Sequence, residues 1–167
     1  MSVRKSLRVL VVDDSAHART ITKMVLQAID ADVRECPDGQ AGLQELRSWT
    51  PDLIIVDYEM RPINGAEFTW RLRALEAEGR KRRTPVLMVT GHNASSVVSN
   101  AVQAGVDGFI NKPITTGMLL GRVEKVLAHA KLAKSRGALP SKSVRPVPES
   151  EAVHYIADAQ PPARRAG

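Results

Sequence analysis

The stretch LIIVDYEMRPING, residues 53–65, decides the fold. Four consecutive apolar residues are typical of a strand that is buried on both faces of a parallel sheet. The run ends on an acidic residue, Asp57, and the loop that follows contains Pro62, Asn64 and Gly65. Taken alone, the acid is explained by a strand that ends at the protein surface. The residues at the ends of the other strands favour a different interpretation.

Short β-rich runs occur on both sides of this stretch and alternate with helical patterns. Five strands that alternate with five helices predict an α/β domain with a parallel central sheet. The second strand is the most polar, so we expect it at an edge of the sheet. The predicted strands are LRVLVV at 7–12, VREC at 33–36, DLIIV at 52–56, PVLMV at 85–89 and DGFIN at 107–111.

The predicted helices show apolar residues at helical spacing. Two of them cover residues 40–48 and 66–78. In the other three, the apolar residues that share one face are Ile21, Met24, Val25 and Ala28; Val97, Val98, Ala101 and Val102; and Leu119, Leu120, Val123, Val126, Leu127 and Ala130.

The composition is that of a globular protein from a reducing compartment. Hydrophobic residues make up 43% of the chain and aromatic residues only 4%, so aliphatic side chains must fill the core. The single cysteine, Cys36, has no disulfide partner and no metal-ligand spacing around it, so we expect it to be buried. No apolar run is long enough to span a membrane, and Asp13 and Asp14 interrupt the N-terminal run too early for a secretory signal. We therefore expect a cytoplasmic protein without a membrane partner.

The regular pattern ends near residue 130. Residues 131–167 are rich in Pro and Ser, and contain seven Lys and Arg against three Asp and Glu. Such a segment cannot bury enough apolar surface to offset the entropy of ordering it. We therefore predict one domain over residues 1–130 and a basic, disordered tail over 131–167. Within the tail, AVHYIADA at 152–159 is the one apolar piece and a candidate docking motif.

Polar residues follow the predicted strands at their carboxyl ends, which meet at one edge of a parallel sheet. Asp13 and Asp14 follow the first strand, and Asp57 follows the third. Thr90 follows the fourth strand and Lys112 the fifth. Two carboxylates about 5 Å apart repel by roughly 3 kcal/mol at an effective dielectric constant of about 20, so three of them need a positive charge nearby. Lys112 is one candidate, and a divalent cation such as Mg²⁺ or Mn²⁺, which prefers oxygen ligands, is another.

These motifs, VLVVDDS, DLIIVDYEM with a following NG, PVLMVTG and GFINKP, resemble the CheY-like receiver domain of two-component response regulators over about residues 7–130. The resemblance implies a doubly wound, flavodoxin-like (βα)5 sheet in the strand order 2-1-3-4-5. It further implies a single-domain response regulator whose partner is a sensor histidine kinase or a histidine phosphotransfer protein. The output would be phosphorylation-dependent binding to another protein. The chain would be no enzyme beyond catalysing its own phosphorylation and dephosphorylation.

The resemblance also implies roles for the clustered residues. Asp57 would be the phosphoacceptor, whose carboxylate attacks the phosphorus of a phosphohistidine. Asp14 would bind Mg²⁺ directly and Asp13 mainly through water, while the backbone carbonyl of Glu59 would complete the protein ligands. Mg²⁺ and Lys112 would neutralise the charge that develops on the transferred phosphoryl group.

Four further features follow from the same resemblance. Thr90 would donate its hydroxyl to a phosphoryl oxygen and, with Phe109, would act as the switch. Taken alone, Thr90 is a strand-end residue and Phe109 a core residue. The Lys112–Pro113 peptide bond would be cis. Glu59 and His92 would modulate access of the water that hydrolyses the phosphorylated form.

The basic loop RKRR at 80–83 leaves a second function open. It is either a solvated loop or a docking site for an anionic partner. In the second case the chain would be a phosphorylation-independent scaffold or an adaptor that binds a second messenger. Nucleic acid is not expected, because no aromatic residues alternate with the basic ones. A flavin-binding protein or an Asp-nucleophile hydrolase is a third possibility, but the phosphate-cradling loop of the former and the Thr after the second acid of the latter are missing.

Overall fold

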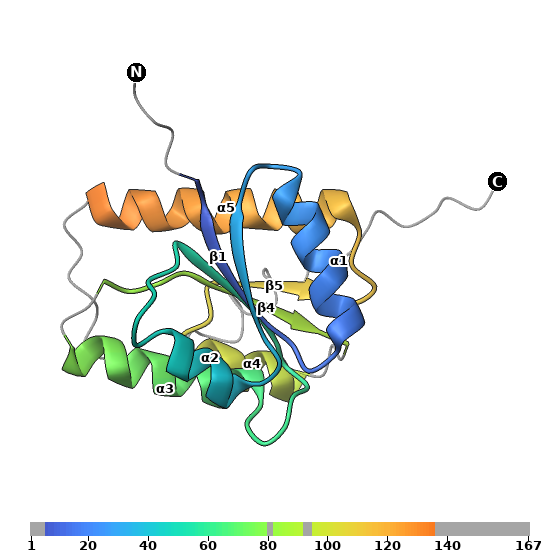
Figure 1. The fold of residues 1–167 in the computed structure, drawn as a ribbon. Helices are drawn as coiled ribbons and strands as arrows, with labels where there is room; N and C mark the ends of the chain where they lie inside the picture. Colours follow the sequence, from blue (N-terminus) through green and yellow to red (C-terminus); the bar gives the residue numbers. More distant parts are fainter. Residues whose placement is uncertain (1–5, 80–81, 92–94, 136–167) are drawn as a thin grey trace.

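The computed structural model describes residues 6–79, 82–91 and 95–135. A five-stranded parallel sheet lies between two layers of helices (Figure 1). Its strand order, β2-β1-β3-β4-β5, confirms the predicted flavodoxin-like order. The strands are β1 (Arg8–Val12), β2 (Asp32–Cys36), β3 (Leu53–Asp57), β4 (Val86–Thr90) and β5 (Gly108–Asn111). The helices are α1 (Ala16–Gln27), α2 (Gly39–Glu45), α3 (Gly65–Glu78), α4 (Ser95–Ala104) and α5 (Thr116–Ser135).

Each face of the sheet packs against its own set of helices. Helices α1 and α5 cover one face, and α2, α3 and α4 cover the other (Figure 1). Because successive side chains of a strand point to opposite faces, Ile54 and Val56 join the core beneath α2–α4, while Leu53 and Ile55 join the core beneath α1 and α5. Strands β3 and β4 are buried along their whole length, as their apolar runs predict.

The buried face of α1 is not the one that the apolar pattern indicated. Ile21 and Met24 are exposed, and Thr22 and Leu26 face the sheet instead. The reason is the short connection from β1, in which Ser15 caps the helix and fixes where it begins. The rotation of α1 about its axis follows from this start, so Thr22 and Leu26, together with the partly buried Val25, provide the contact, while Ile21 and Met24 point outward.

Helix α5 continues to Ser135, past the predicted domain end at residue 130. Residues 131–135 are exposed. Because they do not pack against the core, they carry no apolar periodicity from which the helix could be predicted. The extension contains Lys, Leu and Ala, which have high helix propensity. The remainder of the predicted tail, including the candidate motif at 152–159, lies outside the described residues. Among the helices of the described segments, none combines the length and apolar character needed to cross a membrane.

Strand β2 lies at an edge of the sheet, as predicted, and ends at the buried residue Cys36. Burial raises the pKa of the Cys36 thiol to about 11, and the nearby negative charges of Glu45 and Asp38 act in the same direction. The thiol therefore remains protonated at neutral pH.

We predict that Cys36 reacts slowly with thiol reagents in the native protein. At pH 8 its thiolate population is roughly a hundredfold smaller than that of a thiol with the ordinary pKa of 9.0, and only 6% of the residue is exposed. An aromatic disulfide reagent should titrate one thiol per chain rapidly in urea, and more than a hundredfold more slowly in native buffer. Fast reaction of the folded protein at pH 8 would show that Cys36 is accessible.

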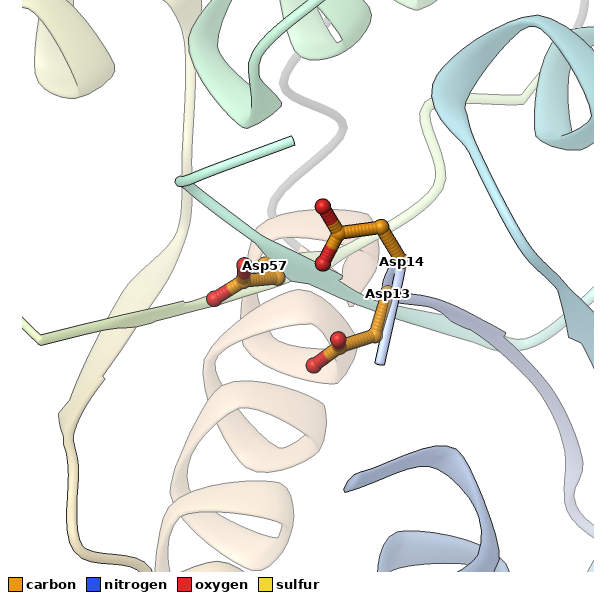
Figure 2. Close-up of side chains that lie close together, drawn as sticks. All are labelled: Asp13, Asp14 and Asp57. Atoms are coloured by element: carbon orange, nitrogen blue, oxygen red, sulfur yellow. The ribbon is translucent and has the colours of Figure 1, made fainter. Parts of the chain in front are cut away.

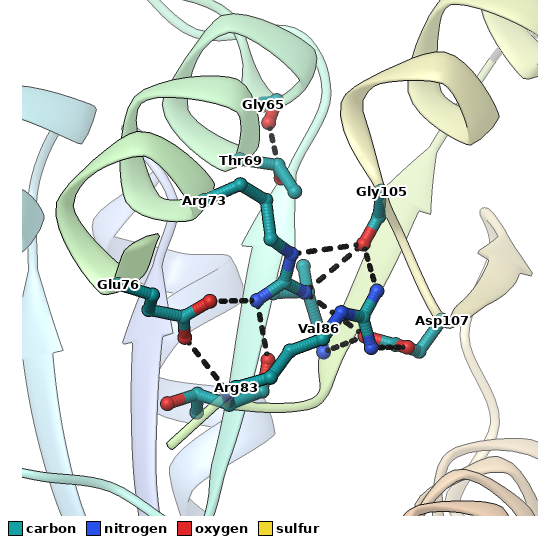
Figure 3. Close-up of polar contacts among 9 residues, drawn as sticks. Gly65, Thr69, Arg73, Glu76, Arg83, Val86, Gly105 and Asp107 are labelled. Atoms are coloured by element: carbon teal, nitrogen blue, oxygen red, sulfur yellow. Dashed lines mark hydrogen bonds and ion pairs between the residues drawn. The ribbon is translucent and has the colours of Figure 1, made fainter. Parts of the chain in front are cut away.

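A largely buried arginine on α3, with 14% of its side chain exposed, connects three parts of the chain (Figure 3). Arg73 donates hydrogen bonds to the carbonyl oxygens of Gly105, at 2.9 and 3.2 Å, and of Thr84, at 2.8 Å. It also forms ion pairs with Glu76 at 2.7 Å and Asp107 at 3.0 Å. We call these five residues the Arg73 network. It connects α3 to the segment before β4 and to the turn between α4 and β5.

The described half of the basic loop is engaged in ion pairs. Arg82 lies 3.3 Å from Asp52, and Arg83 pairs with Asp107 and donates a hydrogen bond of 2.7 Å to the carbonyl of Gly105. The first two residues of the loop lie outside the described residues. For Arg82 and Arg83, these contacts argue against an anion-docking site, and they show more internal pairing than the alternative prediction of a solvated loop implied.

Candidate functional site

Asp13, Asp14 and Asp57 gather at the carboxyl edge of the sheet (Figure 2). Asp57 is the last residue of β3, and the other two follow β1, the neighbouring strand. One carboxylate oxygen from each residue lies within 4.8 Å of those of the other two. The sequence predicted this convergence, because parallel strands present their carboxyl ends at one edge.

Asp57 is the most buried of the three acids, with 2% of its surface exposed. Its Oδ1 lies 2.8 Å from Nζ of Lys112. Burial raises the pKa of the Asp57 carboxyl, and the charges of Asp13 and Glu59 raise it further, while Lys112 acts in the opposite direction. Lys112 is thus the positive charge that offsets the desolvation of Asp57.

The ammonium of Lys112 experiences the same charges with the opposite sign. Burial alone lowers the pKa of Lys112, but the contact with Asp57 and the charges of Asp13 and Glu59 raise it above its ordinary value overall. Lys112 is therefore protonated throughout the physiological pH range and presents a permanent positive charge at the site.

The loop that begins at Lys112 is tied to the end of β4, because the backbone N–H of Lys112 donates a hydrogen bond of 2.9 Å to the carbonyl of Thr90. The Lys112–Pro113 peptide bond is cis, as predicted. A second cis bond, Arg61–Pro62, lies in the loop after β3 and was not predicted.

Asp13 is fixed by its backbone and by its side chain. Its N–H donates to the carbonyl of Cys36 at 3.2 Å, and its Oδ1 accepts from the N–H of Ser15 at 2.8 Å. Burial raises the pKa of the Asp13 carboxyl, and the hydrogen bond from Ser15 opposes this effect. The residue that caps α1 is Ser15, which accepts a hydrogen bond from Ala18. Asp13 is therefore not needed as the helix cap and points into the acidic cluster.

Thr90 and Phe109, the two predicted switch residues, lie on the neighbouring strands β4 and β5. Thr90 is the last residue of β4, which pairs with β3 so that Asp57 lies opposite Val89, and only 1% of Thr90 is exposed. Phe109 is buried in β5, in the core beneath α2–α4. The structure thus brings Thr90 beside the acceptor strand and places the aromatic ring one strand further along the sheet.

Glu59 is exposed and lies over the loop after β4. Its Oε2 would be 3.3 Å from a side-chain carbon added at Gly91. This position at the mouth of the site fits the predicted modulator role of Glu59. His92, the second predicted modulator, lies outside the described residues.

The acidic cluster fits a divalent cation. Asp57 Oδ1 is buried, and its ion-pair partner among the described residues is the single ammonium of Lys112, at 2.8 Å. Three carboxylates face one ammonium, so negative charge remains. Buried carboxylate oxygens without nitrogen or sulfur ligands are the donor set that Mg²⁺ prefers.

Two residues that shape the site have no evident signal of function in the sequence. A Cβ at Gly65 would lie 2.5 Å from the backbone oxygen of Asp57, so only glycine lets α3 begin this close to the acceptor. Arg19 on α1 contacts the backbone of the acidic loop, as described below. The Asn64–Gly65 pair predicted a turn but not this close approach of two backbone segments. Arg19 lies within a predicted helix, where an arginine is ordinary and indicates no function.

The doubly wound sheet, the three acids and the lysine together define an α/β domain of the receiver type. Residues 9–124 match the family model of the response regulator receiver domain. The chain therefore belongs to the response regulator receiver family, and it has the CheY-like fold.

Individual relatives agree with this assignment. The chain is 34% identical over 121 residues to the chemotaxis protein CheY of Pseudomonas aeruginosa, covering 72% of this chain and 95% of that protein. It is 30% identical over 125 residues to the chemotaxis protein CheY-3 of Vibrio cholerae, covering 74% and 94%. Among solved structures, the chemotaxis response regulator CheY4 of Vibrio cholerae superposes with a TM-score of 0.66 at 28% identity, covering 73% of this chain and 99% of that one. Receiver domains of this family act in phosphoacceptor signalling.

Proposed function

We propose that the chain accepts a phosphoryl group on Asp57 from the phosphohistidine of a sensor histidine kinase or a histidine phosphotransfer protein. The observation that carries this proposal is the buried Asp57 carboxylate, paired with Lys112 inside an acidic cluster at the sheet edge. An Asp57 oxygen forms the new O–P bond while the P–N bond to the histidine breaks, and the imidazole leaves with the electron pair of that bond. The product is an aspartyl phosphate.

The protein ligands for Mg²⁺ would be the carboxylates of Asp14 and Asp57 and the backbone carbonyl of Glu59, with Asp13 acting through water. When bound, Mg²⁺ neutralises part of the negative charge on the phosphoryl oxygens. Asp13 and Asp14 supply the charge that draws the cation to this edge.

The remaining side chains act on the phosphoryl group and its consequences. Lys112 is already 2.8 Å from Asp57 and offsets charge on the phosphoryl oxygens as they approach. The Thr90 hydroxyl donates a hydrogen bond to one of these oxygens. Aspartyl phosphate adds nearly two negative charges at the site. Thr90 and Phe109 then shift an existing equilibrium between two arrangements of α4, β5 and α5, and the favoured surface binds a target protein.

Phosphorylation by a small donor tests this function without the cognate kinase. We expect acetyl phosphate with Mg²⁺ to add one phosphoryl group per chain, observed by intact mass spectrometry. Removing Mg²⁺ with a chelator should slow the gain at least tenfold, because the charge on the phosphoryl group is then offset by Lys112 alone. No gain by a folded protein that binds Mg²⁺ would contradict the proposal and favour a phosphorylation-independent scaffold.

A further inference from the structure

The side chain of Arg19 contacts the backbone of the acidic loop and not one of the loop's carboxylates. The side chain extends from α1, and its Nη1 donates a hydrogen bond of 2.7 Å to the carbonyl oxygen of Asp13. Only 17% of the Arg19 side chain is exposed, so this bond is largely shielded from water. A hydrogen bond from a charged donor to a carbonyl oxygen, shielded from water in this way, is stronger than one between two neutral groups.

The carbonyl of Asp13 belongs to the peptide group that joins Asp13 to Asp14. The hydrogen bond from Arg19 therefore fixes the orientation of the peptide group that directly precedes the Cα of Asp14. The preceding peptide is fixed as well, by the bond from the Asp13 N–H to Cys36. Asp14 is exposed, and no described side chain holds its carboxylate. The direction of that carboxylate thus depends on the backbone that Arg19 holds.

Arg19 is itself oriented by the edge strand. Glu35 on β2 lies 3.9 Å from Nε of Arg19, and its other oxygen lies 2.7 Å from Nζ of Lys23. The chain of contacts thus runs from Lys23 through Glu35 and Arg19 to the acidic loop. It connects β2 and α1, which supply no predicted metal ligand, to the peptide between two predicted ligands.

We propose that Arg19 is a positioning residue for the divalent cation, which holds the peptide between Asp13 and Asp14 so that their carboxylates converge with Asp57. The proposal rests on the metal site of the proposed function and extends it to a residue outside the pocket. Charge alone predicts the opposite effect. A guanidinium beside the pocket repels a cation, so on electrostatic grounds its removal would tighten cation binding. The sign of the change therefore separates positioning from charge.

Mn²⁺ binding, followed by the paramagnetic resonance signal of the free ion, measures this sign on the full chain. Arg19→Met should bind Mn²⁺ about tenfold more weakly than the wild type, at the low end of the loss seen when support around metal ligands is removed. Lys23→Met is the matched control. It removes one positive charge from the same Glu35 but leaves the Asp13 carbonyl bonded, so its affinity should be unchanged or slightly higher.

Two further variants make the test independent of overall stability. Arg19→Lys retains the charge with a less rigid donor, so its affinity should lie between those of the wild type and Arg19→Met. It also replaces Arg19→Met in the comparison if circular dichroism shows that protein to be unfolded. Adding Asp14→Asn to Arg19→Met should cost less than the sum of the two single changes, because both act on one ligand.

The outcomes distinguish a failure of the positioning role of Arg19 from a failure of the proposed metal site itself. Equal or tighter Mn²⁺ binding by a folded Arg19→Met, with normal binding by the wild type, would overturn the role of Arg19 alone. Absence of Mn²⁺ binding by the wild type would overturn the proposed metal site and the role of Arg19 with it. A tenfold loss in Arg19→Met, with no loss in Lys23→Met, is the result that the geometry predicts.

Discussion

Replacing Arg73 with methionine is expected to lower the free energy of unfolding by about 2–4 kcal/mol. Methionine fills much of the same volume, but it leaves the nearly buried carboxylate of Glu76 without its ion-pair partner and the carbonyl oxygen of Thr84 without its side-chain donor. Asp107 and the carbonyl oxygen of Gly105 keep their contacts with Arg83. Leaving a nearly buried charge unpaired costs far more than losing an exposed ion pair. Urea unfolding, followed by circular dichroism, measures the difference.

The same helix offers a matched control. Arg71 pairs with Glu67 one turn away, and 43% of each side chain is exposed. Arg71→Met therefore removes an arginine and an ion pair from α3 at a cost of about 0.5 kcal/mol or less. Similar losses for the two variants would show that the Arg73 network contributes no more than a surface ion pair.

Replacing Lys112 with methionine is expected to slow phosphorylation by acetyl phosphate by about 10²–10³-fold. Lys112 is the described ammonium in contact with Asp57, and its positive charge is available to the phosphoryl oxygens from the first approach. The change also removes a positive charge from the cation pocket, so Mg²⁺ binding should be retained or become tighter. Time courses of intact mass at saturating Mg²⁺ give the rate.

Retained Mg²⁺ binding distinguishes a role in phosphoryl transfer from general damage to the pocket. Lys131→Met is the control for net charge, because it removes an exposed lysine near the end of α5. Its phosphorylation rate should match that of the wild type. A Lys112→Met protein that binds Mg²⁺ and is phosphorylated at the wild-type rate would exclude Lys112 from the transfer step.

The sheet, and the position of the acidic cluster at its carboxyl edge, could be predicted because both depend on local sequence patterns. An apolar run such as that of β3 identifies a buried strand, and the parallel arrangement then places its last residue at a common edge. Asp13, Asp57 and Thr90 are each the first polar residue after such a run, and Lys112 directly follows the fifth strand. Their convergence follows from topology and needs no knowledge of side-chain contacts.

Other features depend on contacts between distant segments, which no local pattern encodes. Arg73 and Gly105 meet only when α4 packs beside α3, and Arg19 reaches Asp13 only because α1 has one particular rotation. The same rotation turns Ile21 outward and Thr22 inward, against the apolar pattern. In these places the connections between elements, rather than the spacing of apolar residues, determine which side chains are buried.

Phosphorylation at Asp57 is tested most directly by locating the phosphoryl group. The wild type and Asp57→Asn are incubated with acetyl phosphate and Mg²⁺, and their intact and peptide masses are compared. We predict one phosphoryl group on the wild type, on the peptide that contains Asp57, and none on a folded Asp57→Asn that keeps the neighbouring Asp13 and Asp14. Equal phosphorylation of both proteins, or a phosphoryl group on another peptide of the wild type, would contradict the assignment of Asp57 as the acceptor.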